Sequence, residues 1–238
     1  MTPDHILDTL HEACRRGSVP DVESILRVCD DVDDFMTFES RTALSIAAYA
    51  GRNEICQMLL AKGANPNKET TDGFLPLVMA AGMGHTSTCE LLIAAGADIN
   101  RPDSHGCRPL TQACWHGQIG VVRVLCEHGA DPNLTDSAGF APLDHAAENQ
   151  STPDGEDHTG DITRLLAKHG ANIDYCPAGF EGGLTVLMKA AKYGDLEGCI
   201  LLKQLGASEL VINQSGKNAV DMAREDGHTD VVRFLTEG

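Results

Sequence analysis

The strongest constraint on the fold is a short motif that returns at a nearly fixed interval. The motif reads Leu-x-x-Ala, with valine for leucine in the last copy, and successive alanines are separated by 34, 33, 33, 33, 44 and 33 residues. The alanines are Ala13, Ala47, Ala80, Ala113, Ala146, Ala190 and Ala223. A fixed period of this length is typical of repeat architectures, in which each unit buries its apolar face against its neighbours. The period therefore predicts one stacked array rather than several domains.

The second period shows what one unit contains. Its apolar residues form two short stripes at helical spacing, which are Leu44, Ala47 and Ala48, followed by Ile55, Met58 and Leu59. Gly51 separates the stripes, and Gly63 follows the second stripe where a left-handed helix cap is expected. Asn, Pro, Asp and Gly fill the link to the next unit, as turns and hairpin tips require. The pattern predicts helix, turn and helix, with a hairpin-like link after each pair.

These periods resemble the ankyrin repeat family, whose repeat is about 33 residues long. The resemblance rests on the Leu-x-x-Ala motif and on a later Gly-Ala-Asp or Gly-Ala-Asn, as in "TALSIAAYAGRNEICQMLLAKGANPN" and "RPLTQACWHGQIGVVRVLCEHGADPN". It implies an all-α repeat solenoid of stacked helix-turn-helix units with β-hairpin-like links, forming a single domain over residues 1–238. The approximate repeats are 5–34, 35–67, 68–100, 101–133, 134–174 with an inserted loop at 150–160, 175–210 and 211–238.

The charge balance narrows the classes of partner and compartment. The chain has 35 acidic and 18 basic residues and a net charge of −17, whereas nucleic-acid binders usually display a basic stripe. We therefore expect no nucleic-acid partner. No apolar run is long enough to span a bilayer, and the first residues lack the apolar core of a signal peptide. These features predict no membrane insertion and a cytoplasmic protein, with a nuclear location left open.

The cysteines follow the repeat rather than a metal or catalytic pattern. Cys56, Cys89 and Cys199 each lie nine residues past a marker alanine, which predicts buried packing positions. Cys107 and Cys176 lie in links and are expected to be more exposed. The sequence contains neither a Cys-x-x-Cys pair nor a known catalytic or dinucleotide-binding signature. We predict no enzyme activity, no catalytic residue, no cofactor and no metal site.

The 44-residue interval contains the polar insertion "STPDGEDHTG", Ser151 to Gly160. Gly170 lies 24 residues past Ala146, whereas Gly63 lies 16 past Ala47, so eight extra residues fall between the two helices of the fifth repeat. A tolerated surface loop is the expected reading, because long loops cost little stability. Three alternatives stay open: a partner contact, phosphorylation at Thr152 before Pro153, and a metal held by Asp154, Glu156, Asp157 and His158.

The resemblance also implies where a partner would bind. In ankyrin proteins the hairpin tips and first helices form a concave groove, and variable positions there contact the partner. Those positions lie six before, two after and three after each marker alanine, and they hold five of the ten aromatic residues. The candidate partner-binding residues are Trp115, Tyr49, Phe74, Phe140, Tyr193, His116, Met83, Glu148 and Arg41. For Phe74 and Phe140, inward packing against a neighbouring repeat remains an equal alternative.

The leading functional hypothesis is a non-enzymatic module that binds a partner protein or peptide in this groove. Acidic residues around the aromatic rings favour a partner segment that carries Lys or Arg, through cation–π contact and electrostatic steering. The main alternative is an architectural spacer or the substrate-recruiting arm of a larger protein or complex. An enzyme built on the Ser151–Gly160 insertion is a third hypothesis.

Overall fold

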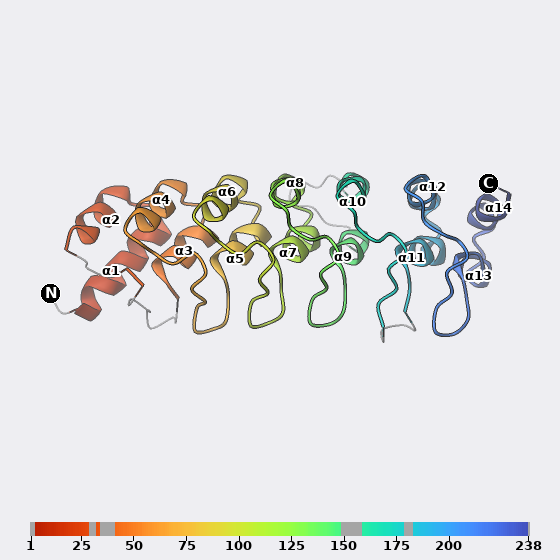
Figure 1. Ribbon diagram of the computed structural model, residues 1–238, viewed down its shortest axis with the longest axis horizontal. Helices are drawn as coiled ribbons and strands as arrows, with labels where there is room; N and C mark the ends of the chain where they lie inside the picture. The colour runs from red at the N-terminus through yellow and green to blue at the C-terminus, as the bar shows by residue number, and fades with distance from the viewer. Residues whose placement is uncertain (1–2, 29–31, 34–40, 149–158, 179–182, 238) are drawn as a thin grey trace. The chain divides into compact units, whose positions relative to one another are not determined.

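The computed structural model describes residues 3–28, 32–33, 41–148, 159–178 and 183–237, with the side chains of residues 3–8 left aside. This described part contains fourteen helices and no strand (Figure 1). The all-α class predicted from the period is confirmed. Internal contacts divide the chain into an N-terminal unit, Met1–Asp131, and a C-terminal unit, Pro132–Gly238, and each unit is described by itself. The single domain over residues 1–238 stays a prediction.

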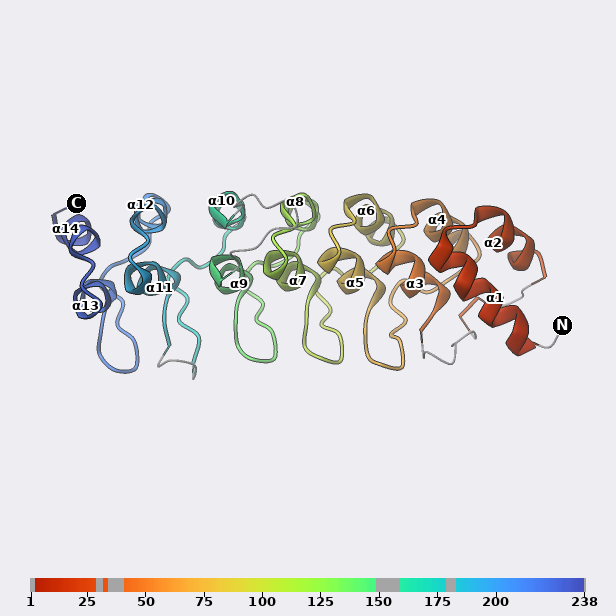
Figure 2. The same ribbon diagram turned by 180° about the vertical axis from the view of Figure 1, so that it is seen from behind.

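The N-terminal unit consists of four helix pairs. The pairs are α1 (Pro3–Arg16) with α2 (Val19–Leu26), α3 (Ala43–Tyr49) with α4 (Asn53–Ala61), α5 (Pro76–Gly82) with α6 (Thr86–Ala94), and α7 (Pro109–Trp115) with α8 (Ile119–Glu127). First helices pack on first helices, in the order α1, α3, α5, α7, and second helices pack on second helices. Two layers result, and the links extend from the layer of first helices (Figures 1 and 2).

The C-terminal unit repeats this arrangement with three pairs. They are α9 (Pro142–Glu148) with α10 (Thr159–Lys168), α11 (Val186–Tyr193) with α12 (Leu196–Gln204), and α13 (Ala219–Glu225) with α14 (Thr229–Glu237). The first helix α11 packs between α9 and α13, and α12 packs on α14. The insertion separates α9 from α10, and residues 151–158 lie outside the described part. Thr159 and Gly160, predicted to end the loop, instead begin α10.

The repeated motif forms the core because it places small and branched apolar side chains between the layers. Ala47, Ala80 and Ala113 are fully buried, and an alanine leaves room for a neighbouring helix to approach closely. Leu44 of the same motif is also buried. Ala190 differs from the other marker alanines, since it is only partly buried. Thin layers of this kind stack along each unit, as a helical repeat requires.

Two backbone hydrogen bonds close each link tip that lies wholly within the described residues. In the first complete link, the amide of Thr70 donates to the carbonyl of Phe74 at 2.9 Å, and the equivalent amide of Asp103 donates to Cys107 at 2.8 Å. Asn67 Oδ1 also accepts from the amide of Asp98 in the next repeat at 2.8 Å. The links are therefore hairpin turns that hold adjacent repeats in register, without an assigned strand in the described residues.

Candidate functional site

Three large apolar side chains lie exposed at equivalent ends of neighbouring first helices in the N-terminal unit. Tyr49 ends α3, Trp115 ends α7, and Met83 caps α5. Their exposed fractions are 46%, 49% and 45%. Because α5 packs against both α3 and α7, these residues form a row across the unit, which we name the apolar row. Exposed apolar patches often mark interaction sites.

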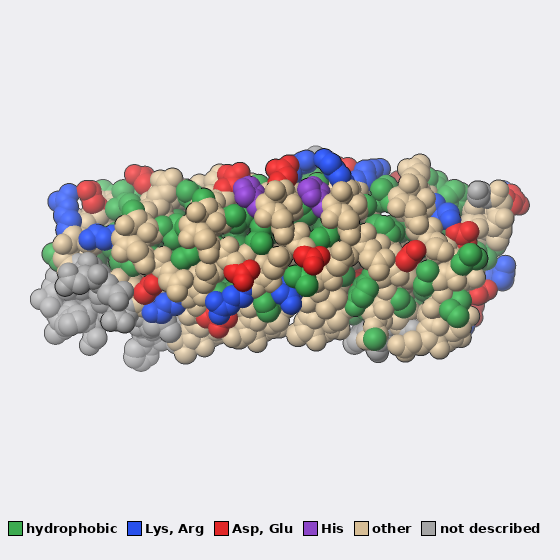
Figure 3. All heavy atoms as spheres, in the orientation of Figure 1, with side chains coloured by type: hydrophobic (Ala, Val, Ile, Leu, Met, Phe, Trp, Pro, Cys, Tyr) green, Lys and Arg blue, Asp and Glu red, His purple; other side chains and the backbone are tan. Residues whose placement is uncertain are grey.

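The helices that carry the apolar row contain no charged residue. Their sequences are ALSIAAY for α3, PLVMAAG for α5 and PLTQACW for α7. A surface helix normally turns charged or polar residues to solvent. Elsewhere, acidic and basic side chains are interspersed over the molecular face shown in Figure 3. The uncharged first helices therefore depart from the usual composition of a solvated surface.

The following repeat contacts the ends of two of these helices, α3 and α5. His85 Nε2 lies 3.0 Å from the carbonyl oxygen of Tyr49, and Gln118 Nε2 donates to the carbonyl of Gly82 at 3.2 Å. Gly51 adopts a φ of 64°, and any Cβ there would meet the His85 ring. Carbonyls at a helix end have no partner within the helix, so these contacts satisfy them. The position of Tyr49 is thus set by the following repeat.

His116 extends the apolar row at the C-cap of α7. The residue is exposed, although part of its ring approaches Gly82 on α5. This partial burial lowers the pKa of His116 below its usual value. The side chain is therefore neutral near neutral pH and adds no charge to the row.

The candidate residues in the links of the N-terminal unit are less exposed. Phe74 is half-buried, and its ring stacks on that of His105 in the next repeat, with centroids 4.5 Å apart and an interplanar angle of 22°. This is the inward packing that the sequence left open. Arg41 is also partly buried, just before α3.

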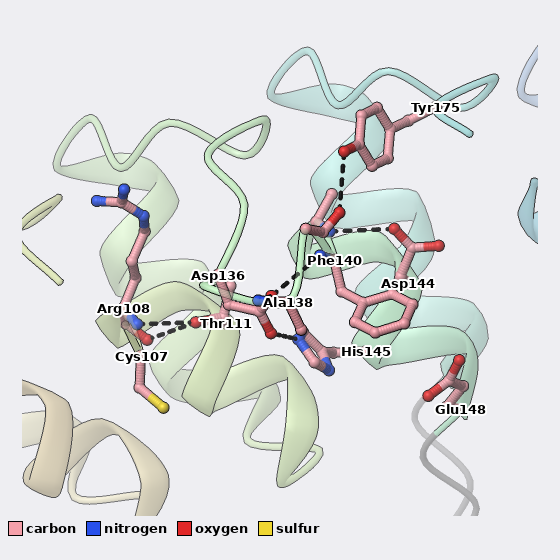
Figure 4. Close-up of polar contacts among 12 residues, drawn as sticks. Cys107, Arg108, Thr111, Asp136, Ala138, Phe140, Asp144, His145, Glu148 and Tyr175 are labelled. Atoms are coloured by element: carbon pink, nitrogen blue, oxygen red, sulfur yellow. Dashed lines mark hydrogen bonds and ion pairs between the residues drawn. The ribbon is translucent and has the colours of Figure 1, made fainter. Parts of the chain in front are cut away.

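In the C-terminal unit, Phe140 packs within a polar cluster (Figure 4). Its ring meets His145 edge-on at a centroid distance of 5.9 Å, and Lys189 Nζ lies 5.4 Å from its centroid. His145 Nε2 lies 2.7 Å from Asp136 Oδ2. Asp136 Oδ1 also accepts from the Phe140 amide at 3.0 Å. These contacts hold the half-buried ring inside the unit.

Lys189 joins α11 to two carboxylates of α9. Its Nζ lies 2.7 Å from Glu148 Oε1 and 3.3 Å from Asp144 Oδ1. Asp144 is buried, and burial raises the pKa of its carboxyl group, while Lys189 and the Ala141 amide oppose that rise. Sequence reasoning named Glu148 but missed Lys189 and Asp144. The signal was available, because Asp144 and Lys189 lie within two residues of consecutive marker alanines.

The remaining candidate, Tyr193, is the most exposed of the set at 70%. Lys192 Nζ lies 5.7 Å from its ring centroid. In the two adjacent repeats, a glutamate is the last residue of the first helix: Glu148 ends α9 and Glu225 ends α13. Lys217 Nζ lies 2.6 Å from Glu225 Oε1. The C-terminal unit thus presents a charged and internally paired counterpart to the apolar row.

The thiols occupy the places that the period predicted. Cys56, Cys89 and Cys199 are buried, and burial raises the pKa of each thiol to about 12. Cys107 and Cys176 are partly exposed. Within the described ranges, no group of three or more His, Cys, Asp or Glu residues is arranged to hold a metal ion. The acidic insertion residues 154–158 lie outside those ranges.

The family follows from a comparison with family models. The model for ankyrin repeats in three copies matches residues 7–70, 44–136 and 156–238, which together cover most of the chain. The chain belongs to the ankyrin repeat family. The crystal structure of the ankyrin repeat domain of Bcl-3, a member of the IkappaB protein family, matches with a TM-score of 0.81 at 24% identity. That match covers 94% of this chain and 97% of the other, and it shows the ankyrin fold.

Two plant proteins share a shorter stretch with this ankyrin chain. One, from Arabidopsis thaliana, is provisionally named E3 ubiquitin-protein ligase XBAT34 and is 36% identical over 75 residues. The other, from Oryza sativa subsp. japonica, is provisionally named E3 ubiquitin-protein ligase XBOS34 and is 37% identical over 75 residues. These stretches are 32% and 31% of the ankyrin chain, and 20% and 14% of the relatives. The ankyrin chain therefore spans a fifth or less of each relative.

Ankyrin repeats are protein–protein interaction modules, and the fold itself is not catalytic. No helix among the described residues has the length and apolar character needed to cross a membrane.

Proposed function

We propose that this ankyrin repeat chain is a non-enzymatic module that binds another protein through the first helices and link ends of its repeats. The apolar row supplies the main contact. The observation that carries the proposal is the exposure of Tyr49, Met83 and Trp115 on three adjacent helices without a charged residue. Large rings at the centre of an interface commonly contribute most of its binding energy.

The other candidate residues have graded roles in this proposal. His116 borders the apolar row, and Tyr193 is a separate exposed ring on the C-terminal unit. Arg41, Phe74, Phe140 and Glu148 have intramolecular surroundings that limit their contact with a partner. We assign these four residues to the edge of the binding surface, where truncation costs little affinity.

The proposed partner also includes a segment with Lys or Arg. The net charge of −17 favours steering of a basic segment, and Glu148 and Glu225 lie at partner-facing repeat positions. Both glutamates already pair with lysines, so we expect the basic segment to increase the association rate more than the final affinity. The same net charge opposes nucleic-acid binding. Separately, we propose a cytoplasmic location for the module.

The alternative is an architectural spacer or the substrate-recruiting arm of a larger protein or complex. The shared stretch with two proteins that bear the names of ubiquitin ligases favours the recruiting arm over the spacer. A recruiting arm also binds a protein, so it is compatible with the surface proposed above. A spacer would leave the apolar row without a contact.

Co-purification tests the proposal. The full chain, its Trp115→Ala variant and its Tyr49→Ala variant are each immobilised and exposed to the same cell lysate, and the retained proteins are identified by mass spectrometry. The proposal predicts at least one protein that the wild type retains and both variants lose. A spacer predicts the same retained proteins for all three.

A further inference from the structure

Two adjacent arginines precede a serine in the turn between α1 and α2. The segment reads Arg-Arg-Gly-Ser-Val, residues 15–19. No other serine or threonine of the sequence has arginines both two and three positions before it. Protein kinases select substrates by patterns of charge, and carboxylates bind guanidinium groups through charge-assisted hydrogen bonds. This spacing, with an apolar residue after the serine, is the pattern that arginine-directed serine kinases recognise.

Both arginine side chains are accessible to an enzyme. The exposed fractions are 51% for Arg15 and 73% for Arg16. Each guanidinium group contacts Glu12 in the preceding turn of α1, at 3.1 and 2.5 Å. Ion pairs at the surface contribute little stability, because water and salt screen them. Carboxylates of a kinase can therefore replace Glu12 without a large cost to the fold.

The hydroxyl group of Ser18 lies at the surface of the same turn. Ser18 is the N-cap residue of α2, and its side chain makes no capping hydrogen bond to the helix backbone. Instead, Ser18 Oγ donates to Asp21 Oδ2 at 2.6 Å in an exposed contact. Transfer of a phosphoryl group to Oγ therefore removes one exposed hydrogen bond and no helix cap.

The turn belongs to a repeat with a neighbour on one side. Among the described residues, α1 packs on α2 and on one first helix, α3, whereas α3 and α5 each have a first helix on both sides. The amides of Gly17 and Ser18 donate to the Ala13 carbonyl at 2.9 Å, and Arg52 Nη2 donates to the Arg15 carbonyl at 3.3 Å. Stability in a helical repeat comes from neighbouring units, so such a repeat opens at lower cost. The last turn of α1 can therefore unwind and enter the peptide groove of a kinase in an extended form.

Three hydroxyl groups elsewhere in the chain follow a single arginine by three residues. Ser104 Oγ donates to Glu69 Oε2 at 3.2 Å, and the arginine before it, Arg101, also contacts Glu69, at 3.0 Å. Thr111 is buried in the first turn of α7. Thr236 is exposed in the last turn of α14 but has no second arginine before it. These residues serve as internal comparisons.

We propose that Ser18 is phosphorylated by an arginine-directed serine/threonine kinase that recognises Arg15 and Arg16. Ser18 Oγ attacks the γ-phosphorus of Mg·ATP, the bond from that phosphorus to the oxygen bridging the β-phosphate breaks, and ADP leaves. The serine proton passes to the catalytic carboxylate of the kinase. The product replaces a neutral hydroxyl by a group with a charge of about −2 at the surface of the first repeat. This site does not depend on the proposed binding function.

Kinase assays on the folded full chain test the site. A panel of purified arginine-directed kinases, including cAMP-dependent protein kinase, is supplied with Mg·ATP, and peptide mass spectrometry locates the phosphate. We expect phosphate on Ser18 at an initial rate at least about tenfold above the rates at Ser104 and Thr236. A synthetic peptide of residues 12–24 is the control for recognition by each kinase.

Variants separate recognition from folding. Ser18→Ala should abolish the main product, and Arg15→Gln combined with Arg16→Gln should lower the initial rate at least about tenfold. Arg27→Gln is the matched control, because Arg27 is an exposed arginine paired with a glutamate four residues earlier, as Arg16 is. The control should react as the wild type does, and a thermal melt verifies the fold of each variant.

Different results would overturn the proposal for different reasons. Phosphate on the peptide but not on the folded chain would show that the turn stays closed to kinases. No phosphate on the peptide from any kinase of the panel would show that the arginine pair is not recognised. A double arginine variant that reacts as fast as the wild type, or a faster reaction at Ser104 or Thr236, would place recognition elsewhere.

Discussion

Lys189 Nζ lies 2.7 Å from Glu148 Oε1, so a glutamate that we propose to face a partner is already held by the next repeat. The same ammonium group lies 3.3 Å from the buried carboxylate of Asp144. The corresponding first helices of the N-terminal unit, from α3 to α7, have no such ionic link because they contain no charged residue. Repeats of one family therefore use equivalent positions for different purposes: internal pairing in one unit and an exposed apolar row in the other.

Replacement of Lys189 by methionine should destabilise the C-terminal unit at neutral pH. The change removes the cation beside buried Asp144, and loss of one partner from a largely buried pair costs about 2 kcal/mol or more. Denaturant unfolding of the full chain, followed by circular dichroism, measures the change. Lys217→Met is the matched control, because its pair with Glu225 is exposed and should contribute less than about 1 kcal/mol.

The cost of Lys189→Met should also decrease in acid. Burial raises the folded-state pKa of Asp144, so its ionisation lowers stability as the pH rises through that pKa. Removal of Lys189 raises the pKa further, because Lys189 favours the charged form. The difference between variant and wild type should therefore be larger at about pH 7 than at about pH 4.5, where more Asp144 is protonated. A difference that is constant over this range would show that Asp144 is not the group involved.

Native thiol labelling should separate the cysteines by depth. Cys56, Cys89 and Cys199 are buried with pKa values of about 12, so they have almost no reactive thiolate and should react only on unfolding. Cys107, or else Cys176, should label first in the described part of the chain. A pulse of maleimide followed by peptide mass spectrometry measures the order. Rapid labelling of Cys56 in the native protein would contradict the helix register.

Deletion of residues 151–158 should leave the fold intact. Helix α9 ends at Glu148 and α10 begins at Thr159, so the deletion removes no residue of either helix. It also returns Gly170 to 16 residues past Ala146, the spacing of Gly63 from Ala47. We expect an unchanged or slightly higher melting temperature, because a shorter loop costs less closure entropy. Loss of partner binding with an unchanged melt would assign a function to the insertion.

The period predicted the fold well because the information is local and repeated. A marker alanine, a leucine three residues earlier and a glycine after each helix fix which face is buried, and Ala47, Leu44 and Gly51 occupy those places. The exposure of Tyr49 and Trp115 agrees with the register, since both residues follow the buried stripe of a first helix. Their role in binding stays a prediction.

Contacts between repeats were harder to predict. The stacking of Phe74 on His105 and the position of Lys189 near Phe140 depend on side-chain directions in two different repeats. The period of one repeat gives the position of a side chain along the chain but not its rotamer. For this reason, inward and outward positions of Phe74 and Phe140 were equally compatible with the sequence.

The most direct test of the central claim is a binding titration with Trp115→Ala. The isolated partner is titrated with wild type, Trp115→Ala and the Tyr193→Ala control, and each protein is melted thermally. We predict that Trp115→Ala weakens binding roughly thirty-fold, while the control binds normally. The melting temperature should scarcely change, because the Trp115 side chain is half exposed. Normal binding by Trp115→Ala, or a melting temperature lowered by many degrees, would contradict the assignment of the apolar row as the binding surface.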